Sequence, residues 1–127
     1  MYKDQITLKL PTKKEYVKIA RLTAASIAAN MNFDIEMLED IKVAVGEAMN
    51  IAFKFENEKF KEIELFFQVN ENVFEVKVNY PGCLESEIKK NESDDLSFLI
   101  LKSLMDDVKT SCDSHSASLV MQKRLDV

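Results

Sequence analysis

The spacing of the apolar residues changes several times along this chain, and this pattern limits the fold more than any other feature. In some stretches every second residue is apolar, which is typical of a strand with one buried face. In other stretches apolar residues recur at every third or fourth position, which is typical of a helix. The pattern predicts strands at residues 5–10, 63–69, 74–80, 109–112 and 117–125, and helices at 13–31, 34–53 and 94–108.

These elements predict an α+β fold with two layers. Each helix has one apolar stripe and each strand has one apolar face, so helices packed on one face of a sheet bury both. Two alternating runs flank the short turn Asn70-Glu71-Asn72, which predicts an antiparallel hairpin. We therefore expect an antiparallel or mixed sheet with its helices on one face. At 127 residues, the chain is expected to form a single domain over residues 1–127.

Composition narrows the classes of function. The net charge of -5 argues against nucleic acid as a partner, because contacts to phosphates need a basic face, and it favours a basic protein surface. There is no run of about 18 apolar residues and no signal-like start, so we expect a cytoplasmic protein without a membrane span. Cys83 and Cys112 match no zinc-binding or CxxC spacing and are expected to be reduced thiols.

The helix expected at 34–53 carries the most informative side chains. Asp34 is suited to cap its N-terminus. Its apolar half is built largely from small residues: Val43, Ala44, Val45, Ala48 and Ala52. Glu47 and Asn50 lie within this run, one helical turn apart. A carboxylate and an amide in this arrangement could hold a metal ion, a water molecule or a nucleotide phosphate, or they could form a solvated edge of the helix.

Three segments, together with the order of elements, resemble a known family. The segments are 40–48 (DIKVAVGEA), 99–108 (LILKSLMDDV) and 120–125 (VMQKRL). Over nearly the whole chain the sequence is similar to the GHKL (Bergerat-fold, histidine-kinase-like) ATPases, and among them to the anti-sigma-factor serine kinases. The resemblance implies a two-layer α/β sandwich with a mixed, mostly antiparallel sheet and about three helices on one face.

The resemblance also implies an activity, cofactors and partners. Such proteins hold a sigma factor inactive, and they use Mg-ATP to phosphorylate a serine of a STAS-type anti-anti-sigma protein. They often form homodimers, so the resemblance implies a homodimer here. In the family, a helix ending in an E-A-x-x-N box supplies a general-base glutamate and a metal-binding asparagine. Glu47 matches the catalytic base, and Asn50 is the candidate ligand of the metal and the nucleotide.

Three further residues are implied as nucleotide contacts. The family binds adenine with a D-x-G-x-G turn, which falls on residues 80–84 here and includes Tyr80 and Gly82. A G-x-G segment before the third helix lets backbone amides approach the phosphates, and Ser97 falls at its end. Tyr80, Gly82 and Ser97 are therefore candidate cofactor-binding residues.

Several positions depart from the family's motifs. Residue 51, where the box has its asparagine, is Ile51, and Asn50 stands one residue early, which turns the amide by about 100° around the helix. Tyr80 replaces the aspartate that accepts a hydrogen bond from adenine, and Leu84 replaces the second glycine. Asp95 replaces a glycine and brings negative charge towards a triphosphate. We therefore expect degenerate ATP-binding motifs.

Three functions are consistent with the sequence. The first is an anti-sigma-factor-like regulator that acts by binding proteins and binds ATP and Mg²⁺ weakly or not at all. The second is an active serine kinase in which Glu47 takes the proton of the substrate hydroxyl. The third is a generic ligand-binding α/β module, since a fold does not by itself imply a function. Whether the protein is an enzyme is left open by its sequence.

Overall fold

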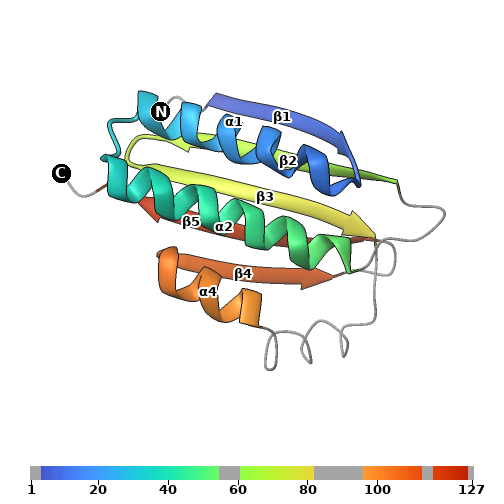
Figure 1. Cartoon of the computed structure of the whole chain (residues 1–127). Helices are drawn as coiled ribbons and strands as arrows, with labels where there is room; N and C mark the ends of the chain where they lie inside the picture. Colours follow the sequence, from blue (N-terminus) through green and yellow to red (C-terminus); the bar gives the residue numbers. More distant parts are fainter. Residues whose placement is uncertain (1–3, 55–60, 82–95, 113–115, 126–127) are drawn as a thin grey trace.

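The fold consists of one layer of helices and one layer of strands (Figure 1). The computed structural model describes residues 4–54, 61–81, 96–112 and 116–125. In chain order the elements are β1 (Asp4–Pro11), a short 3-10 turn (Lys14–Tyr16), α1 (Val17–Asn30), α2 (Ile35–Phe53), β2 (Glu62–Asn70), β3 (Val73–Pro81), α4 (Leu96–Leu104), β4 (Asp107–Cys112) and β5 (Ser116–Arg124). The predicted two-layer α+β fold is confirmed.

The strands form a single sheet in the order β1-β2-β3-β5-β4. Every pair of neighbouring strands among the described residues is antiparallel, so the sheet is not mixed. The predicted hairpin joins β2 to β3, with Asn70 paired to Val73 and Glu71 in the turn at a positive φ of 52°. Short connections of this kind join only antiparallel neighbours, which explains the direction of β2 and β3.

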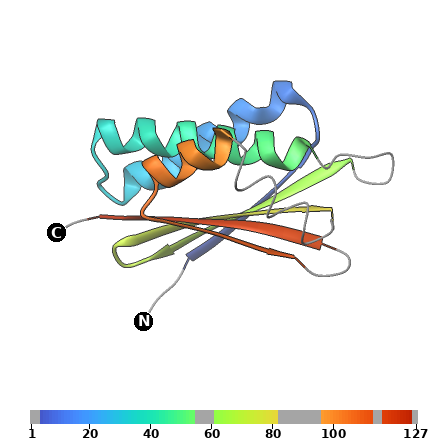
Figure 2. The ribbon, with the colours of Figure 1, turned by 90° about the horizontal axis from the view of Figure 1, so that it is seen from below.

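The helices lie on one face of the sheet, as Figure 2 shows from its edge. Alternate side chains of each central strand point towards them and are buried: Ile63, Leu65, Phe67, Phe74, Val76, Val78, Leu119 and Met121. This alternation is the physical basis of the sequence signal, because successive residues of a strand face opposite sides of the sheet. The apolar face of the sheet and the apolar stripes of the helices together form one core.

Helix α2 lies between α1 and α4 and packs over the middle of the sheet (Figure 1). Its start is fixed by Asp34, whose side chain accepts a hydrogen bond from the backbone N–H of Met37 at 2.8 Å. Ala44, Ala48 and Ala52 are fully buried. Their small side chains allow the sheet and both neighbouring helices to approach the same helix closely.

The helix predicted at 94–108 is wrong at its C-terminal end. Helix α4 ends at Leu104, and Val108 lies in β4 opposite Met121. The interval between Leu104 and Val108 matches the spacing of a helix, but Val108 also begins an alternation with Thr110 and Cys112 that faces the core side of the sheet. Pairing with β5 prevails there, because the sheet offers Val108 backbone partners and a buried surface.

The buried stripe of α4 also differs from the apolar spacing that predicted the helix, which included Leu96 and Leu99. Leu96 and Leu99 are exposed, at 70% and 58% of their surface, while Phe98 and Leu101 are buried. The first turn of α4 therefore carries apolar side chains that face away from the core. Among the described helices, none is both long and apolar enough to span a membrane.

We expect Asp34→Ala to lower the free energy of unfolding by about 1 kcal/mol, because it removes the side-chain cap of α2. Urea denaturation followed by circular dichroism measures the change. Asp34→Ser is the control, since serine also accepts a hydrogen bond at this position and should cost much less. Equal losses in the two variants would contradict the capping role.

Candidate functional site

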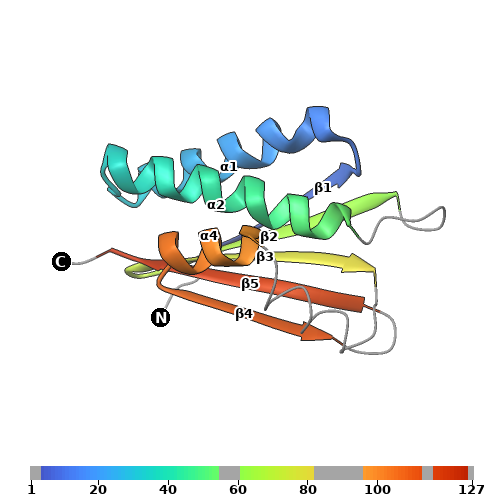
Figure 3. The same ribbon diagram turned by 60° about the horizontal axis from the view of Figure 1, so that its bottom comes forward.

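The candidate catalytic residue Glu47 contacts a second candidate residue, Ser97. The Ser97 hydroxyl donates a hydrogen bond of 2.7 Å to Oε2 of Glu47, and the contact is half-buried. The two residues belong to α2 and α4, which lie side by side in Figures 1 and 3. The structure therefore brings together two residues that are 50 positions apart in the sequence. A hydroxyl that donates to an ionised carboxylate makes one of the stronger hydrogen bonds in proteins.

Asn50 and Ile51 face in different directions. The side chain of Asn50 is exposed, whereas Ile51 is 1% exposed and belongs to the core. The position at which the family's box has an amide is therefore filled by a buried hydrocarbon side chain, which has no oxygen to offer a metal ion. Val43, predicted on the buried half of the helix, is 42% exposed. The polar residues Glu47 and Asn50 thus lie on the outer side of α2 with Val43, and not inside its apolar run.

The two candidates from the adenine turn are placed differently. Tyr80 is buried near the end of β3, opposite Ala117 of β5. Gly82 lies outside the described residues, as do Leu84 and Asp95. The roles assigned to these residues, and to Glu47, Asn50 and Ser97, stay predictions.

The described residues offer no cluster of acidic side chains for a magnesium ion. Mg²⁺ prefers a nearly octahedral set of oxygen ligands. Within the described ranges, no three side chains of histidine, cysteine, aspartate or glutamate gather closely enough to hold a metal ion. Ile51 supplies no ligand, and Asn50 offers a single amide at an exposed position.

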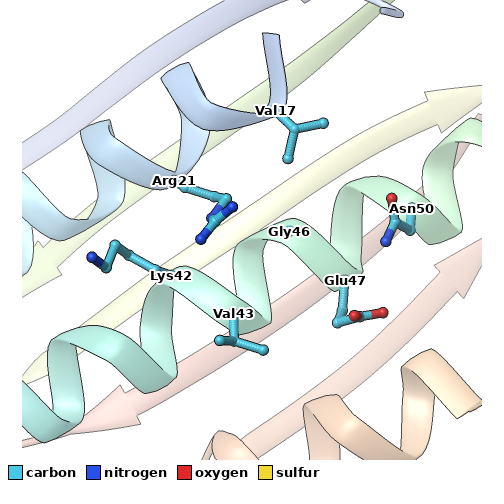
Figure 4. A pocket seen from close by; sticks show the side chains of 7 residues that line it. All are labelled: Val17, Arg21, Lys42, Val43, Gly46, Glu47 and Asn50. Atoms are coloured by element: carbon cyan, nitrogen blue, oxygen red, sulfur yellow. The ribbon is translucent and has the colours of Figure 1, made fainter. Parts of the chain in front are cut away.

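An open groove of about 230 Å³ lies between α1 and α2 (Figure 4). In that view the sheet lies behind the helices, so the groove is on the outer side of the helical layer. Its lining residues come from these two helices alone: Val17, Arg21, Lys42, Val43, Gly46, Glu47 and Asn50. Glu47 and Asn50, predicted one turn apart, therefore share this groove.

The described charged side chains of the groove point in different directions and do not pair with one another. Arg21 extends from α1 towards Gly46, and Glu47 points away from it, towards α4 (Figure 4). Lys42 pairs with Glu39 at 2.7 Å on the surface of α2. Among the described residues, none forms an ion pair with Arg21. The groove thus contains a guanidinium group without an ion-pair partner among the described residues, next to both apolar and polar side chains.

Arg21 lies beside Gly46. A Cβ atom at Gly46 would lie 3.5 Å from Cδ of Arg21, an ordinary van der Waals distance, so the stem of the arginine runs next to this part of α2. Arg21 is a residue of the groove that the sequence motifs did not predict. Its signal was a single charge in residues 19–33, which are otherwise uncharged. A guanidinium group in such a place is suited to a carboxylate, which it binds through two parallel hydrogen bonds.

Comparisons with known proteins agree with this architecture. A family model described as histidine kinase-like ATPase domain matches residues 10–123. The serine-protein kinase RsbW of Listeria innocua is 36% identical, in an alignment that covers 94% of this chain and 87% of the relative. The RsbW proteins of Oceanobacillus iheyensis and Bacillus thuringiensis are each 30% identical; the alignments cover 94% and 92% of this chain, and 86% and 83% of the relatives.

The family match spans most of the chain and includes every helix and nearly every strand described above. The similarity to the kinases also extends over most of both sequences. The chain therefore belongs to the histidine kinase-like ATPase domain family, as a relative of the RsbW serine-protein kinases, which confirms the family predicted from its sequence.

Proposed function

We propose that this protein is an anti-sigma-factor-like regulator that acts by binding other proteins and binds ATP weakly or not at all. Its family and its similarity to RsbW kinases support the regulatory role. The observation that carries the proposal is the place of Ile51, which is buried in the core where the family's box has a metal-binding asparagine. Without that ligand, Mg²⁺ loses the side chain that would connect it to α2.

The helical layer supports a role in binding proteins. Among the described residues, the large apolar side chains that are exposed lie mostly on helices: Ile19, Leu22, Ile35, Val43, Leu96 and Leu99, with Ile6 on β1. Exposed apolar residues on a layer that also carries an unpaired cation are typical of a surface that binds a partner. We propose that a sigma factor and a STAS-type anti-anti-sigma protein are the partners. The expected homodimer and cytoplasmic location belong to the same proposal.

Isothermal titration with Mg-ATP should show no binding at millimolar ligand. The physical reason is the loss of the metal ligand at Ile51, together with the negative charge that Asp95 adds to the sequence of the phosphate-binding segment. An unrelated ATP-dependent kinase, titrated in the same buffer, serves as the positive control. A dissociation constant in the micromolar range would overturn the weak-binding part of the proposal.

Arg21→Glu should weaken binding of the sigma factor encoded nearest to this chain's gene by about tenfold or more. The substitution replaces the unpaired cation of the groove by an anion, which repels an acidic group of the partner. Surface plasmon resonance measures the dissociation constant.

Lys18→Glu is the matched control, because it makes the same change of charge on an exposed position of α1 outside the groove. Equal losses in the two variants would show that net charge, and not the groove, determines the affinity. If neither a sigma factor nor a STAS-type protein binds the wild-type chain, the generic ligand-binding module becomes the better explanation.

One observation favours an active serine kinase as the second candidate function. The carboxylate of Glu47 already accepts a hydrogen bond from a serine hydroxyl, that of Ser97, so it can approach such a group with the geometry that a general base needs. ATP would supply the phosphoryl group, and Glu47 would take the proton of the substrate serine. The other described residues that line the groove would position the substrate protein.

Glu47→Gln tests this second function. Labelled phosphate should pass from ATP to a STAS-type partner with the wild-type chain, and at least about 100-fold more slowly with the variant, because an amide takes up no proton. The amide oxygen still accepts the Ser97 hydroxyl, so the fold is kept. Glu36→Gln, the same change at an exposed position of α2, is the control. No transfer by the wild-type chain would eliminate the kinase.

A further inference from the structure

We infer that the contact between Ser97 and Glu47 is a latch that holds the first turn of α4 on α2 and limits access to the Glu47 carboxylate. A second polar contact holds the other end of α4. Nζ of Lys123 donates a hydrogen bond of 2.5 Å to the carbonyl oxygen of Leu104 and lies 3.7 Å from Oδ2 of Asp40. Both ends of α4 are thus tied to α2, one directly and one through β5.

The spacing of the two contacts matches on both helices. Asp40 and Glu47 are seven residues apart on α2, and Ser97 and Leu104 are seven residues apart on α4. Seven residues are close to two helical turns, or about 10.5 Å along the axis. The helices run in opposite directions, as the colours of Figures 1 and 3 show, so the start of α4 meets the second half of α2. Both contacts can therefore form at once.

Apolar packing fills the space between the contacts. Phe98 and Leu101 of α4 are buried, as are Ala44 and Ala48 of α2. Burial of this kind is strong but non-directional. The polar contacts at the two ends therefore fix how far α4 slides along α2 and how it is rotated.

The two ends of α4 are not held equally strongly. The side chain of Lys123 is 12% exposed, comes from the sheet and places a positive charge at the C-terminal end of α4, where the helix dipole favours it. At the other end, the half-buried bond from Ser97 stands next to Leu96, which is 70% exposed. The N-terminal end of α4 is thus the end that opens first, and the Lys123 end acts as the hinge.

The latch has a consequence for Glu47. One oxygen of its carboxylate is engaged by Ser97, and the same residue lines the groove between α1 and α2. A group that takes the position of the Ser97 hydroxyl on this oxygen must displace it. Release of the first turn of α4 therefore exposes this side of the Glu47 carboxylate, in the free protein and irrespective of which partner it binds.

Hydrogen exchange of the free protein tests the latch. Ser97→Ala should raise the exchange rate of the backbone amides of residues 99–101 about tenfold, because it removes a hydrogen bond to a charged group. Glu47→Ala removes the same contact and should also raise the rate, and the double variant should exchange no faster than the faster of the two single variants. Ser103→Ala is the matched control: Ser103 is exposed on the same helix and bonds only to the carbonyl of Ile100.

Carboxyl labelling tests access to Glu47. With a carbodiimide and glycine ethyl ester as the probe, mass spectrometry should find Glu47 labelled several-fold faster in Ser97→Ala than in the wild-type chain or in Ser103→Ala. Ser97→Thr keeps the hydroxyl and should restore slow labelling. Equal labelling of Glu47 in all variants, or additive changes of exchange in the double variant, would overturn the latch. Neither readout uses ATP or a partner, so a failure of the proposed function leaves this test intact.

Discussion

The position of α2 is the constraint on which the rest of the structure depends. This helix packs on the sheet with one side and on α1 and α4 with its flanks, and small side chains at part of its buried surface let these neighbours approach it closely. The buried alanines at 44, 48 and 52 are these small residues. A larger residue at any of them would push the sheet or a neighbouring helix away and would enlarge the groove and break the contacts of α4 together.

The outer side of the same helix carries the groups with functional potential. Glu47 faces α4, Asn50 faces the groove, and Arg21 reaches across from α1 (Figure 4). The inner side of α2 is entirely apolar, and Ile51 is part of the core there. Helix α2 thus has two different sides. Its buried side holds the layers together, and its solvent-exposed side presents charges and apolar residues to another protein.

Much of the fold could be predicted from the spacing of apolar residues, because strands and helices bury side chains with different periods. The hairpin of β2 and β3 and the cap at Asp34 followed from local rules. The end of α4 did not, because Val108 fits both periods and only its pairing with Met121 decides between them. For the site, the contact of Glu47 with Ser97 joins distant residues, and no local pattern encodes it. Arg21 left a weak signal, a single charge within residues 19–33, whose meaning depends on the groove around it.

The matched spacing of seven residues on α2 and α4 restricts how the chain can change in length. Inserting or deleting one residue between Asp40 and Glu47 would rotate one of them by about 100° relative to the other. Lys123 could then no longer contact Asp40 while Ser97 contacts Glu47. Single substitutions within the segment would be tolerated wherever they preserve the small buried side chains. This part of the protein must therefore keep the distance between Asp40 and Glu47 constant. The identity of most residues between them matters less.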